Sequence, residues 1–502
     1  DSSTSRGLGD VYKRQKLKST LLALGMMLPA SVFATDYYIR TAANGTGDGS
    51  SWDNAMSFET FYTNFQNNAN YASGDAFYFA EGTYVVPEVS VATQVAKAFT
   101  FKGGYSETLT GTELPDVDYS AHRTIISGDR NGDGIQNAGD ARCLFALQAN
   151  TTSTTNPQRP ILIQGIDFCY VYTSEPTSDN SNRKGALCID NSGDVTIKNC
   201  RFYNNEIASE GSSIGGAALL NYRSTVHLID CEFTNNKAKS RGAAIRVASN
   251  AGTKGHLTVE RCLFAGNEVT NNNGSAIFVQ HSPVVTIVNS TIVDNKGTEA
   301  VYIGAPNNDY KRVLNIISST IANNAGGNQV KMVVGNIANS IIVGCADAGS
   351  DVADAIAVTG GEAAIVSGGN NILETGDAAV TADATDVTLE KGSAYATVFG
   401  TNVLTDGVLV PVYKATGALA DALATTVAEW GVEGVDLTVD QNGTVRGATV
   451  PGAVKADIKD AISSIEVADK ADDAYYYTLS GIRVATPQKG IFIKNGKKVI
   501  IK

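Results

Sequence analysis

Charged residues are scarce in this chain of 502 residues: 18% are Asp, Glu, Lys or Arg, against roughly 25% in an ordinary soluble domain. Basic residues are the minority, 39 against 51 acidic ones, and the formal net charge is -12. Because nucleic acids and anionic membranes attract clustered Lys and Arg, we expect neither as a partner. The composition also excludes collagen, a coiled coil and a charged disordered chain, so the surface must rely on uncharged polar groups.

Cysteine and long apolar runs are scarce as well. Seven cysteines in a chain of this length do not make a disulfide scaffold. A membrane-spanning helix needs about 20 consecutive apolar residues, and no stretch of the sequence reaches that length. We therefore expect no transmembrane helix.

The N-terminal region has the character of leader sequence and not of folded structure. Residues 1–15 lack any periodicity and resemble translated sequencing-adapter read-through, so we exclude them from the fold. Residues 16–34 follow the order of a signal peptide, with Lys16 and Lys18 before the apolar run from Leu21 to Leu28. Cleavage after Ala34 would leave Thr35 as the mature N-terminus, so we expect export.

An internal repeat begins to show at three evenly spaced cysteines, Cys200, Cys231 and Cys262, which lie 31 residues apart. The segments around them read VTIKNCRFYNN, VHLIDCEFTNN and LTVERCLFAGN, and further copies make the repeat clearest over 159–345. Alternate apolar residues within each copy indicate a β-strand with one inward face. A small residue (Cys or Ser) and then a bulky one (Phe or Ile) follow at fixed positions.

The last fixed position of each copy is an asparagine. Asparagine tolerates the left-handed backbone of a tight corner, and stacked copies can join their amides from coil to coil. We therefore expect the asparagines to have a left-handed backbone and to form one hydrogen-bonded structural ladder. Its members are Asn205, Asn236, Asn267, Asn295 and Asn324.

Coils of this kind cannot bury their inner face alone, whereas stacked coils with parallel strands about 4.8 Å apart can. Helical repeats would show a helical period, and a propeller would show four strands per blade. The sequence therefore predicts an all-β protein, a right-handed parallel β-helix solenoid, over residues 35–453.

Two short motifs carry a more specific resemblance. Gly-Gly-Ala-Ala at 215–218 and Gly-Ala-Ala-Ile at 242–245 resemble the GGAI element of polymorphic outer-membrane protein repeats. Phe-Tyr-Asn-Asn at 202–205 and Phe-Thr-Asn-Asn at 233–236 match the FxxN element of those repeats. The wider family is the pectin-lyase-like right-handed β-helix, and the resemblance covers about 37–450. It implies the fold more than an activity, because lyases, hydrolases and adhesins share this fold.

The C-terminal end differs from the repeats. Residues 454–474 read as a linker, and Asn495-Gly496 between two apolar runs indicates a β-hairpin within 475–502. This short antiparallel β tail resembles the C-terminal sorting segment of type IX secretion and related systems. The resemblance implies outer-membrane secretion or anchoring machinery as a partner. The location would be extracellular or on the outer-membrane surface of a Gram-negative bacterium. A terminal cap for the β-helix is the alternative.

Outward columns of the repeats bring acids and arginines side by side, as in a lyase or hydrolase site. Arg201 falls beside Glu232 on the next coil, and Asp230 beside Arg261. These residues are weak catalytic candidates, because simple cross-strand ion pairing explains them equally. The stacked cysteines are expected to be core residues and not metal ligands. The four histidines occupy different columns and are expected at the surface: His122, His227, His256 and His281.

A possible calcium loop runs from Asp129 to Asp140. Its sequence, DRNGDGIQNAGD, follows the twelve-residue spacing of calcium loops. The side chains of Asp129, Asn131 and Asp133, the carbonyl of Ile135, and then Asn137 and Asp140 would supply oxygen ligands. A turn rich in Asp, Asn and Gly is the alternative explanation.

Three classes of function remain open. The main hypothesis is a non-catalytic, adhesin-like or glycan-binding platform whose partners are glycans or molecules on host or neighbouring cells. The first alternative is a polysaccharide lyase or glycoside hydrolase of the pectin-lyase-like superfamily. The second is a structural surface stalk.

Overall fold

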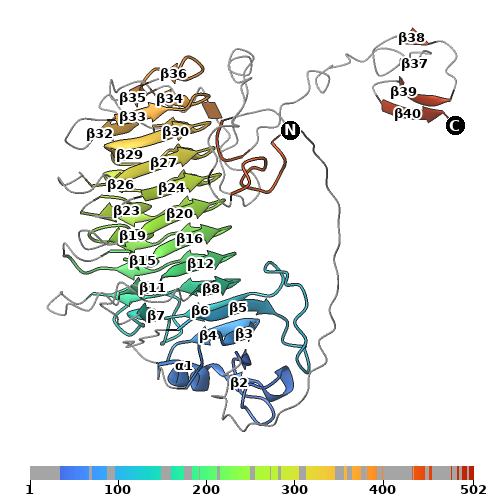
Figure 1. Cartoon of the computed structure of the whole chain (residues 1–502), viewed down its shortest axis with the longest axis vertical. Helices are drawn as coiled ribbons and strands as arrows, with labels where there is room; N and C mark the ends of the chain where they lie inside the picture. Colours follow the sequence, from blue (N-terminus) through green and yellow to red (C-terminus); the bar gives the residue numbers. More distant parts are fainter. Residues whose placement is uncertain are drawn as a thin grey trace, which may run out of the picture.

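The protein is a right-handed parallel β-helix with a short antiparallel β tail, as seen in a computed structural model (Figure 1). The structure describes the following residues: 34–66, 70–87, 97–148, 160–174, 184–190, 193–211, 215–248, 255–271, 273–280, 284–304, 312–344, 355–358, 364–374, 380–381, 383–392, 398–399, 432, 435–446, 451–454, 476–477, 483–484, 489–494 and 497–501. The predicted fold class is thereby confirmed. The signal peptide at 16–34 lies outside these residues except for Ala34, and the linker at 454–474 lies outside them except for Val454. The hairpin turn at Asn495-Gly496 also lies outside them. Within the described part, no helix has the length and apolar character needed to cross a membrane.

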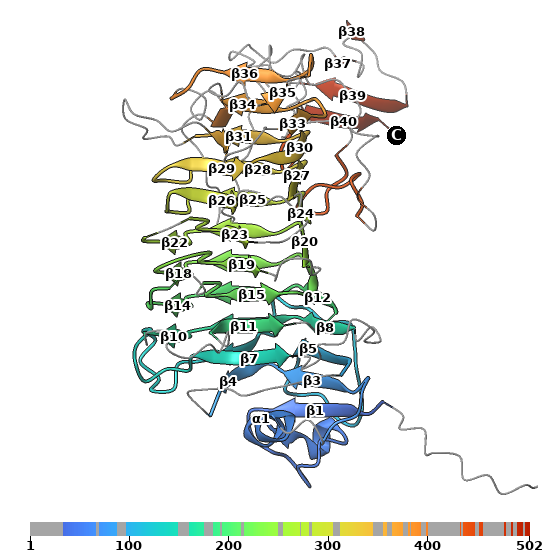
Figure 2. The ribbon, with the colours of Figure 1, turned by 60° about the vertical axis from the view of Figure 1, so that its left-hand side comes forward.

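Four parallel sheets run along the stack, and each coil contributes one strand to most of them (Figure 2). Sheet A contains thirteen strands. They are β1 (Asp36–Arg40), β2 (Met56–Ser57), β3 (Ala76–Ala80), β5 (Phe99–Tyr105), β8 (Ile161–Gln164), β12 (Asp194–Lys198), β16 (Thr225–Ile229), β20 (His256–Glu260), β24 (Val284–Val288), β27 (Val313–Ile317), β30 (Val334–Ala338), β33 (Ala364–Ser367) and β35 (Val380–Thr381).

Sheet B follows sheet A across one corner of each coil. Its eleven strands are β4 (Gly82–Val85), β6 (Thr124–Ser127), β9 (Ile166–Cys169), β13 (Arg201–Tyr203), β17 (Glu232–Thr234), β21 (Leu263–Ala265), β25 (Thr291–Val293), β28 (Thr320–Ala322), β31 (Ile341–Val343), β34 (Ile372–Glu374) and β36 (Val387–Leu389).

Sheet C closes the coil, and a short sheet D lies between sheets B and C in the middle coils. Sheet C contains β7 (Cys143–Gln148), β11 (Gly185–Asp190), β15 (Leu219–Tyr222), β19 (Ile245–Ala248), β23 (Ile277–Gln280), β26 (Glu299–Ile303), β29 (Asn328–Met332) and β32 (Ile356–Val358). Sheet D contains β10 (Tyr172–Thr173), β14 (Glu206–Ile207), β18 (Lys237–Ala238) and β22 (Glu268–Val269). The tail is a separate antiparallel sheet of β37 (Tyr476–Tyr477), β38 (Arg483–Val484), β39 (Gly490–Lys494) and β40 (Lys497–Ile501).

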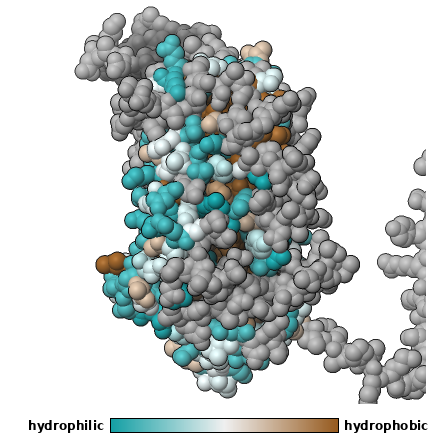
Figure 3. Space-filling model, turned by 90° about the vertical axis from the view of Figure 1, so that its left-hand side faces the viewer, coloured by the Kyte–Doolittle hydropathy of each residue, from teal (hydrophilic) through white to brown (hydrophobic). Residues whose placement is uncertain are grey.

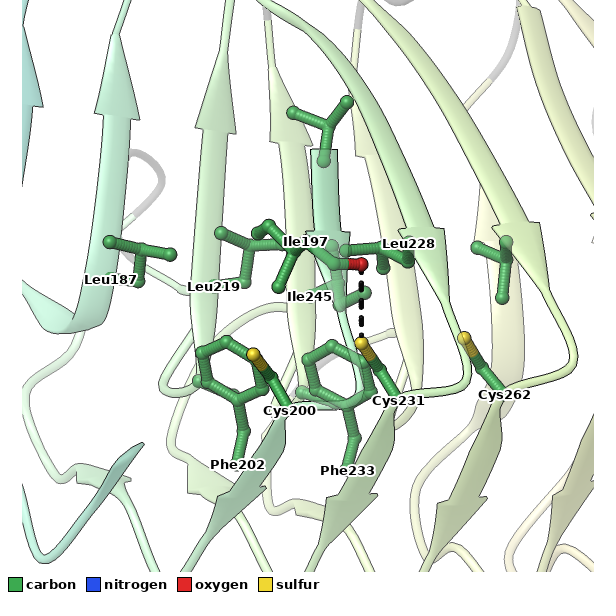
Figure 4. Close-up of a cluster of buried hydrophobic side chains, with 14 of the residues drawn as sticks. Leu187, Ile197, Cys200, Phe202, Leu219, Leu228, Cys231, Phe233, Ile245 and Cys262 are labelled. Carbon is green, nitrogen blue, oxygen red and sulfur yellow. Dashed lines mark hydrogen bonds between the residues drawn. The ribbon is translucent and has the colours of Figure 1, made fainter. Parts of the chain in front are cut away.

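The register between coils places like residues on like residues. Phe202 pairs with Phe233, and Phe233 with Phe264, so their rings stack at 4.8 and 4.7 Å between centroids. The cysteine column lies against these rings, inside the coil (Figure 4). Cys231 is buried, and its thiol donates to the carbonyl of Ile197 at 3.4 Å. The six cysteines of the described residues are all buried.

The asparagine ladder is buried and continuous. The Oδ1 of Asn236 accepts both the backbone and the side-chain amide of Asn205, at 3.2 and 2.9 Å. Asn236 in turn donates both amides to Asn267 in the same way, and the pattern runs on through Asn295 and Asn324. Gln329 ends it by accepting the side-chain amide of Asn324 at 2.7 Å.

The left-handed backbone lies one residue before the ladder, contrary to expectation. Asn204 and Asn235 have φ of 53 and 54°, whereas the ladder residues that follow them are not among those with positive φ. The physical reason is that two neighbouring residues have different roles at each corner. The left-handed residue turns the chain and stays at the surface, and the turn directs the next side chain inward, where its amide meets the neighbouring coils.

One helix, α1 (Phe58–Gln66), covers the N-terminal end of the stack beside a short 3-10 turn, η1 (Trp52–Asn54). Phe61 and Phe65 of α1 pack on Phe77 and Phe101 of the first coils, with centroids 5.1 Å apart in both cases. This aromatic plug closes the core against water at one end.

A late segment lies along the outside of the stack. This strap (residues 435–446 and 451–454) is drawn in red-orange beside β20 to β30 in Figures 1 and 2. Gln441 donates to the carbonyl of Cys262 at 3.0 Å, and the backbone of Ala453 donates to Thr320 at 2.9 Å. Gly452 has φ of 99°, and a Cβ there would come within 2.8 Å of Ile341. The strap thus covers the outer face of sheet B instead of adding a coil.

Candidate functional site

The outer face of sheet B changes character along the stack. In the later coils it is mostly apolar, with Thr291 and Thr320 among its residues, and the strap covers part of it. In β9, β13 and β17 the same column holds Asp167, Arg201 and Glu232, which are neighbours in register. Together with Arg123, just before β6, they form what we call the charged strip.

Asp167 is the centre of the charged strip. It is fully buried and accepts Arg201 through both oxygens, with Nη2 to Oδ2 at 2.7 Å. Arg123 also pairs with Asp167, and its Nη1 donates to the carbonyl of Tyr119 at 2.6 Å. Two guanidinium groups therefore share one carboxylate, which leaves one positive charge. The Arg201 side chain is 39% exposed, so this charge faces solvent.

Burial lowers the pKa of Arg123, and the neighbouring charge of Arg201 lowers it further. Glu232, the expected partner of Arg201, is exposed on the next coil, while Arg201 turns back to Asp167. The strip thus presents a fixed cation followed by the exposed carboxylate of Glu232.

The second expected pair lies at the corner between sheets A and B. Arg261 donates to Asp230 through Nε at 2.7 Å and through Nη2 at 3.1 Å. Its Nη1 also contacts Glu260, whose other oxygen lies 2.9 Å from His227 Nε2. We call these four residues the corner cluster. Burial acts to raise the pKa of Glu260, but the bonds from His227 and Arg261 outweigh it and lower the pKa.

Sequence reasoning missed Asp167, although a signal was available. Ile166 aligns with the cysteine column, so Asp167 falls directly in the column of Arg201 one coil earlier. Gln329, which ends the asparagine ladder, was missed for a different reason: it belongs to sheet C and not to the repeat position.

The histidines lie apart from one another in the described residues. His122 pairs with Glu81 at 3.0 Å, His227 belongs to the corner cluster, and His256 begins β20. All three are half-buried, and His281 lies outside the described residues.

The possible calcium loop lies between β6 and β7 and is mostly exposed. Asn131 and Asn137 both donate their side-chain amides to Asp133, at 2.9 and 2.7 Å. Asp140 is buried at its end. Across the described residues, no three His, Cys, Asp or Glu side chains are gathered as the ligands of one metal ion. Any ion in this loop would need oxygens of other kinds.

A family model describes the same type of fold. Residues 118–308 match the family described as the right handed beta helix region. A search of curated proteins found no match. Among solved structures, a rhamnogalacturonan lyase is similar at 12% identity and a TM-score of 0.34, covering 67% of this chain and 87% of that one. The pectate lyase Pel9A is similar at 13% identity and a TM-score of 0.30, covering 88% and 96%. XylC, in a complex with xylose, is similar at 11% identity and a TM-score of 0.28, covering 71% and 86%.

Proposed function

We propose that this protein is an exported, non-catalytic β-helix that binds acidic glycans along the charged strip. The observation that carries the proposal is the shared carboxylate of Asp167, which fixes Arg123 and Arg201 in place. A guanidinium held in this way presents its remaining N–H groups in a planar fork that matches a carboxylate or sulfate. The binding group is therefore organised before the ligand arrives, which lowers the entropic cost of binding.

The pKa directions favour binding over cleavage. A glycosidase acid must hold a proton near neutral pH, so its pKa must be raised. In the corner cluster the pKa of Glu260 is lowered. The carboxyl groups whose pKa is raised by burial include Glu107, Glu206 and Asp294, and they lie in separate parts of the fold. A lyase reading of Arg201 is also disfavoured, because its guanidinium is already engaged by the carboxylate of Asp167.

The surrounding surface suits a binding platform. Hydrophilic residues predominate among those described on the flank in Figure 3. The chain carries a net charge of -12, which would repel an acidic polymer at long range. Salt screens that repulsion beyond about 8 Å at physiological ionic strength, so local contacts with the strip decide binding. The leader and the tail, as the sequence predicts them, would place this platform outside the cell.

The test is binding to immobilised uronate and sulfated polysaccharides, with neutral glycans alongside. We expect Arg201→Gln to weaken binding to the acidic polymers about tenfold, the equivalent of about 1.4 kcal/mol. Asp167 keeps Arg123 as a partner in that variant, so the fold should survive. Arg223→Gln is the matched control, since Arg223 forms a similar pair with Asp190 at another corner. Equal loss in both variants, or no binding by the native protein, would contradict the proposal. The appearance of unsaturated uronate product would favour the lyase alternative.

A further inference from the structure

Sheet C carries a column of cationic and aromatic side chains on its outer face, along β19, β23, β26 and β29 (Figure 2). The register places Arg246 next to Phe278 and Phe278 next to Tyr302. Lys331 follows Tyr302 on the next coil. The residue before each of them in its strand belongs to the hydrophobic core. Because side chains alternate along a strand, this column faces outward.

The aromatic rings of the column hold a second arginine in place. Phe278 and Tyr302 are stacked, with centroids 5.1 Å apart and ring planes 5° from parallel. Arg241 lies in the loop before β19, and its Cζ is 5.0 Å from the centroid of Phe278. A guanidinium over an aromatic face is attracted by the electrons of the ring. The ring therefore fixes the guanidinium of Arg241 over the outer face of sheet C.

The two arginines converge on one oxygen atom. Arg241 donates through Nη1 to Oε1 of Gln280 at 3.4 Å, and Arg246 donates through Nη2 to the same atom at 3.1 Å. This oxygen belongs to a neutral amide. A hydrogen bond from a guanidinium to a negatively charged oxygen is roughly twice as strong as one between neutral groups. The geometry at this point therefore suits an anion better than it suits the amide.

The electrostatics of the two arginines lead to the same conclusion. Arg246 is 5% exposed, and burial followed by the charge of Arg241 lowers its pKa to about 10. The two positive charges thus oppose each other beneath the surface, and an anion between them would attract both. Elsewhere on this sheet, Arg223 binds the carboxylate of Asp190, with Nη2 to Oδ1 at 2.6 Å.

The surroundings add charge and leave a route to the shared oxygen. Arg241 and Gln280 are only half-buried, so a small ion can approach the two guanidinium groups from that side. Arg312 lies over the end of β26, where a Cβ on Gly304 would come within 2.9 Å of its Nη1. Arg312 adds a third positive charge to this part of sheet C, and burial lowers its pKa.

We infer that Arg241 and Arg246 bind one divalent oxyanion, a phosphate or sulfate group, on the outer face of sheet C. Two guanidinium groups carry two positive charges, which a divalent oxyanion balances and a carboxylate balances only by half. A tetrahedral group also has enough oxygens to accept from both planar forks at once. On binding, the ion replaces Oε1 of Gln280 as the acceptor. The charged strip lies on sheet B, so this inference does not depend on the proposed glycan binding.

The experiment is calorimetric titration of sodium sulfate and of sodium phosphate into the full chain, with sodium acetate at matched ionic strength as the control ion. We expect saturable binding of sulfate and phosphate, about tenfold or more tighter than that of acetate. Arg246→Gln should weaken this binding by about tenfold or more. Arg223→Gln is the matched control, because it removes the same charge from a pair on the same sheet, and it should bind as the native protein does.

Gln280→Glu is the second variant, and it keeps the size of the side chain. It places a carboxylate where the two guanidinium groups meet, so the fold should survive and the affinity for sulfate should fall by about tenfold or more. This variant decides the matter if Arg246→Gln does not fold. Absence of sulfate and phosphate binding by the native protein would overturn the inference. Equal binding by the native and Gln280→Glu proteins would also overturn it, because the ion would then bind elsewhere.

The source of the oxyanion is distinguished by titration of glucose 6-phosphate. Affinity equal to that of inorganic phosphate supports a phosphate ester carried by a sugar as the ligand. Binding of the inorganic ions alone supports a free ion at the same site. Uronate polymers report separately on the charged strip, because Gln280 lies on a different sheet.

Discussion

At the corner of each middle coil, a ladder asparagine uses every hydrogen-bonding position of its side chain. Asn236 donates to Asn267 and to the carbonyl of Phe202, and it accepts two amides from Asn205. A buried network that is fully satisfied stabilises the fold, whereas the same network with one member missing leaves several groups unpaired. The ladder therefore tolerates no apolar substitute.

Replacing Asn236 by Leu tests this at the scale of one residue. We expect a loss of stability of about 1–3 kcal/mol for a buried group left unpaired, and more if several stay dry. Asn336→Leu is the control, because Asn336 lies on the outer face of sheet A and is only half-buried. Its substitution should change stability by no more than about 0.5 kcal/mol. The measurement is urea unfolding of both variants. Equal unfolding midpoints would show that the ladder is not a buried hydrogen-bonded network.

The columns of the repeat could be predicted because each reflects a local physical demand. The alternation of apolar and polar residues determines which side chains face inward. The stacking of Phe202 on Phe233 therefore follows from the sequence alone. The left-handed residue could not be separated from its neighbour, because Asn204 and Asn205 are both asparagine and only their φ differs. The partner of Arg201 was assigned to the next coil, since pattern alone does not say which way a long side chain turns.

At the scale of elements, the ends and the outer cover of the stack were not predictable. α1 places Phe58, Phe61 and Phe65 at helical spacing, a signal that a search for repeats passes over. The strap contacts residues far away in the sequence: Arg446 donates to Asn289 at 2.8 Å across 157 positions. A local sequence pattern cannot predict such a contact, because the contact depends on how many coils lie between the two residues.

Arg446 holds the strap on the β-helix. Its guanidinium is buried, which lowers its pKa to about 10, and it donates to carbonyls of Val439 and Ala453 as well as to Asn289. We expect Arg446→Met to leave these acceptors unpaired at a cost of about 1–3 kcal/mol. The freed strap would expose the apolar face of sheet B, so binding of a hydrophobic dye should rise.

Arg223→Met is the control for the strap prediction. The ion pair of Arg223 with Asp190 is half-exposed, and such pairs contribute about 0.2–1 kcal/mol. If dye binding and the melting temperature respond alike in the two variants, the strap does not depend on Arg446.

At the scale of the whole molecule, the β-helix is close to one-dimensional. Within the described coils, strands pair with the strands of adjacent coils, as in the run from β8 through β12 and β16 to β20. In stacked repeats, stability is roughly a sum of each unit and its interfaces with its neighbours. A ligand at one corner should therefore stabilise nearby coils and leave distant ones unchanged.

A substitution at one corner should likewise affect nearby coils alone, and Asn236→Leu allows this locality to be measured. Asn236 bonds to Asn205, Asn267 and Phe202, so we expect the variant to show faster amide hydrogen exchange in β13, β17 and β21. Exchange in β31, β34 and β36, several coils away, should not change, because the coils interact mainly with their neighbours. Hydrogen exchange read by mass spectrometry, with Asn336→Leu as the control, resolves these segments. Uniformly faster exchange along the whole stack would mean that the coils unfold as one unit, contrary to the one-dimensional account.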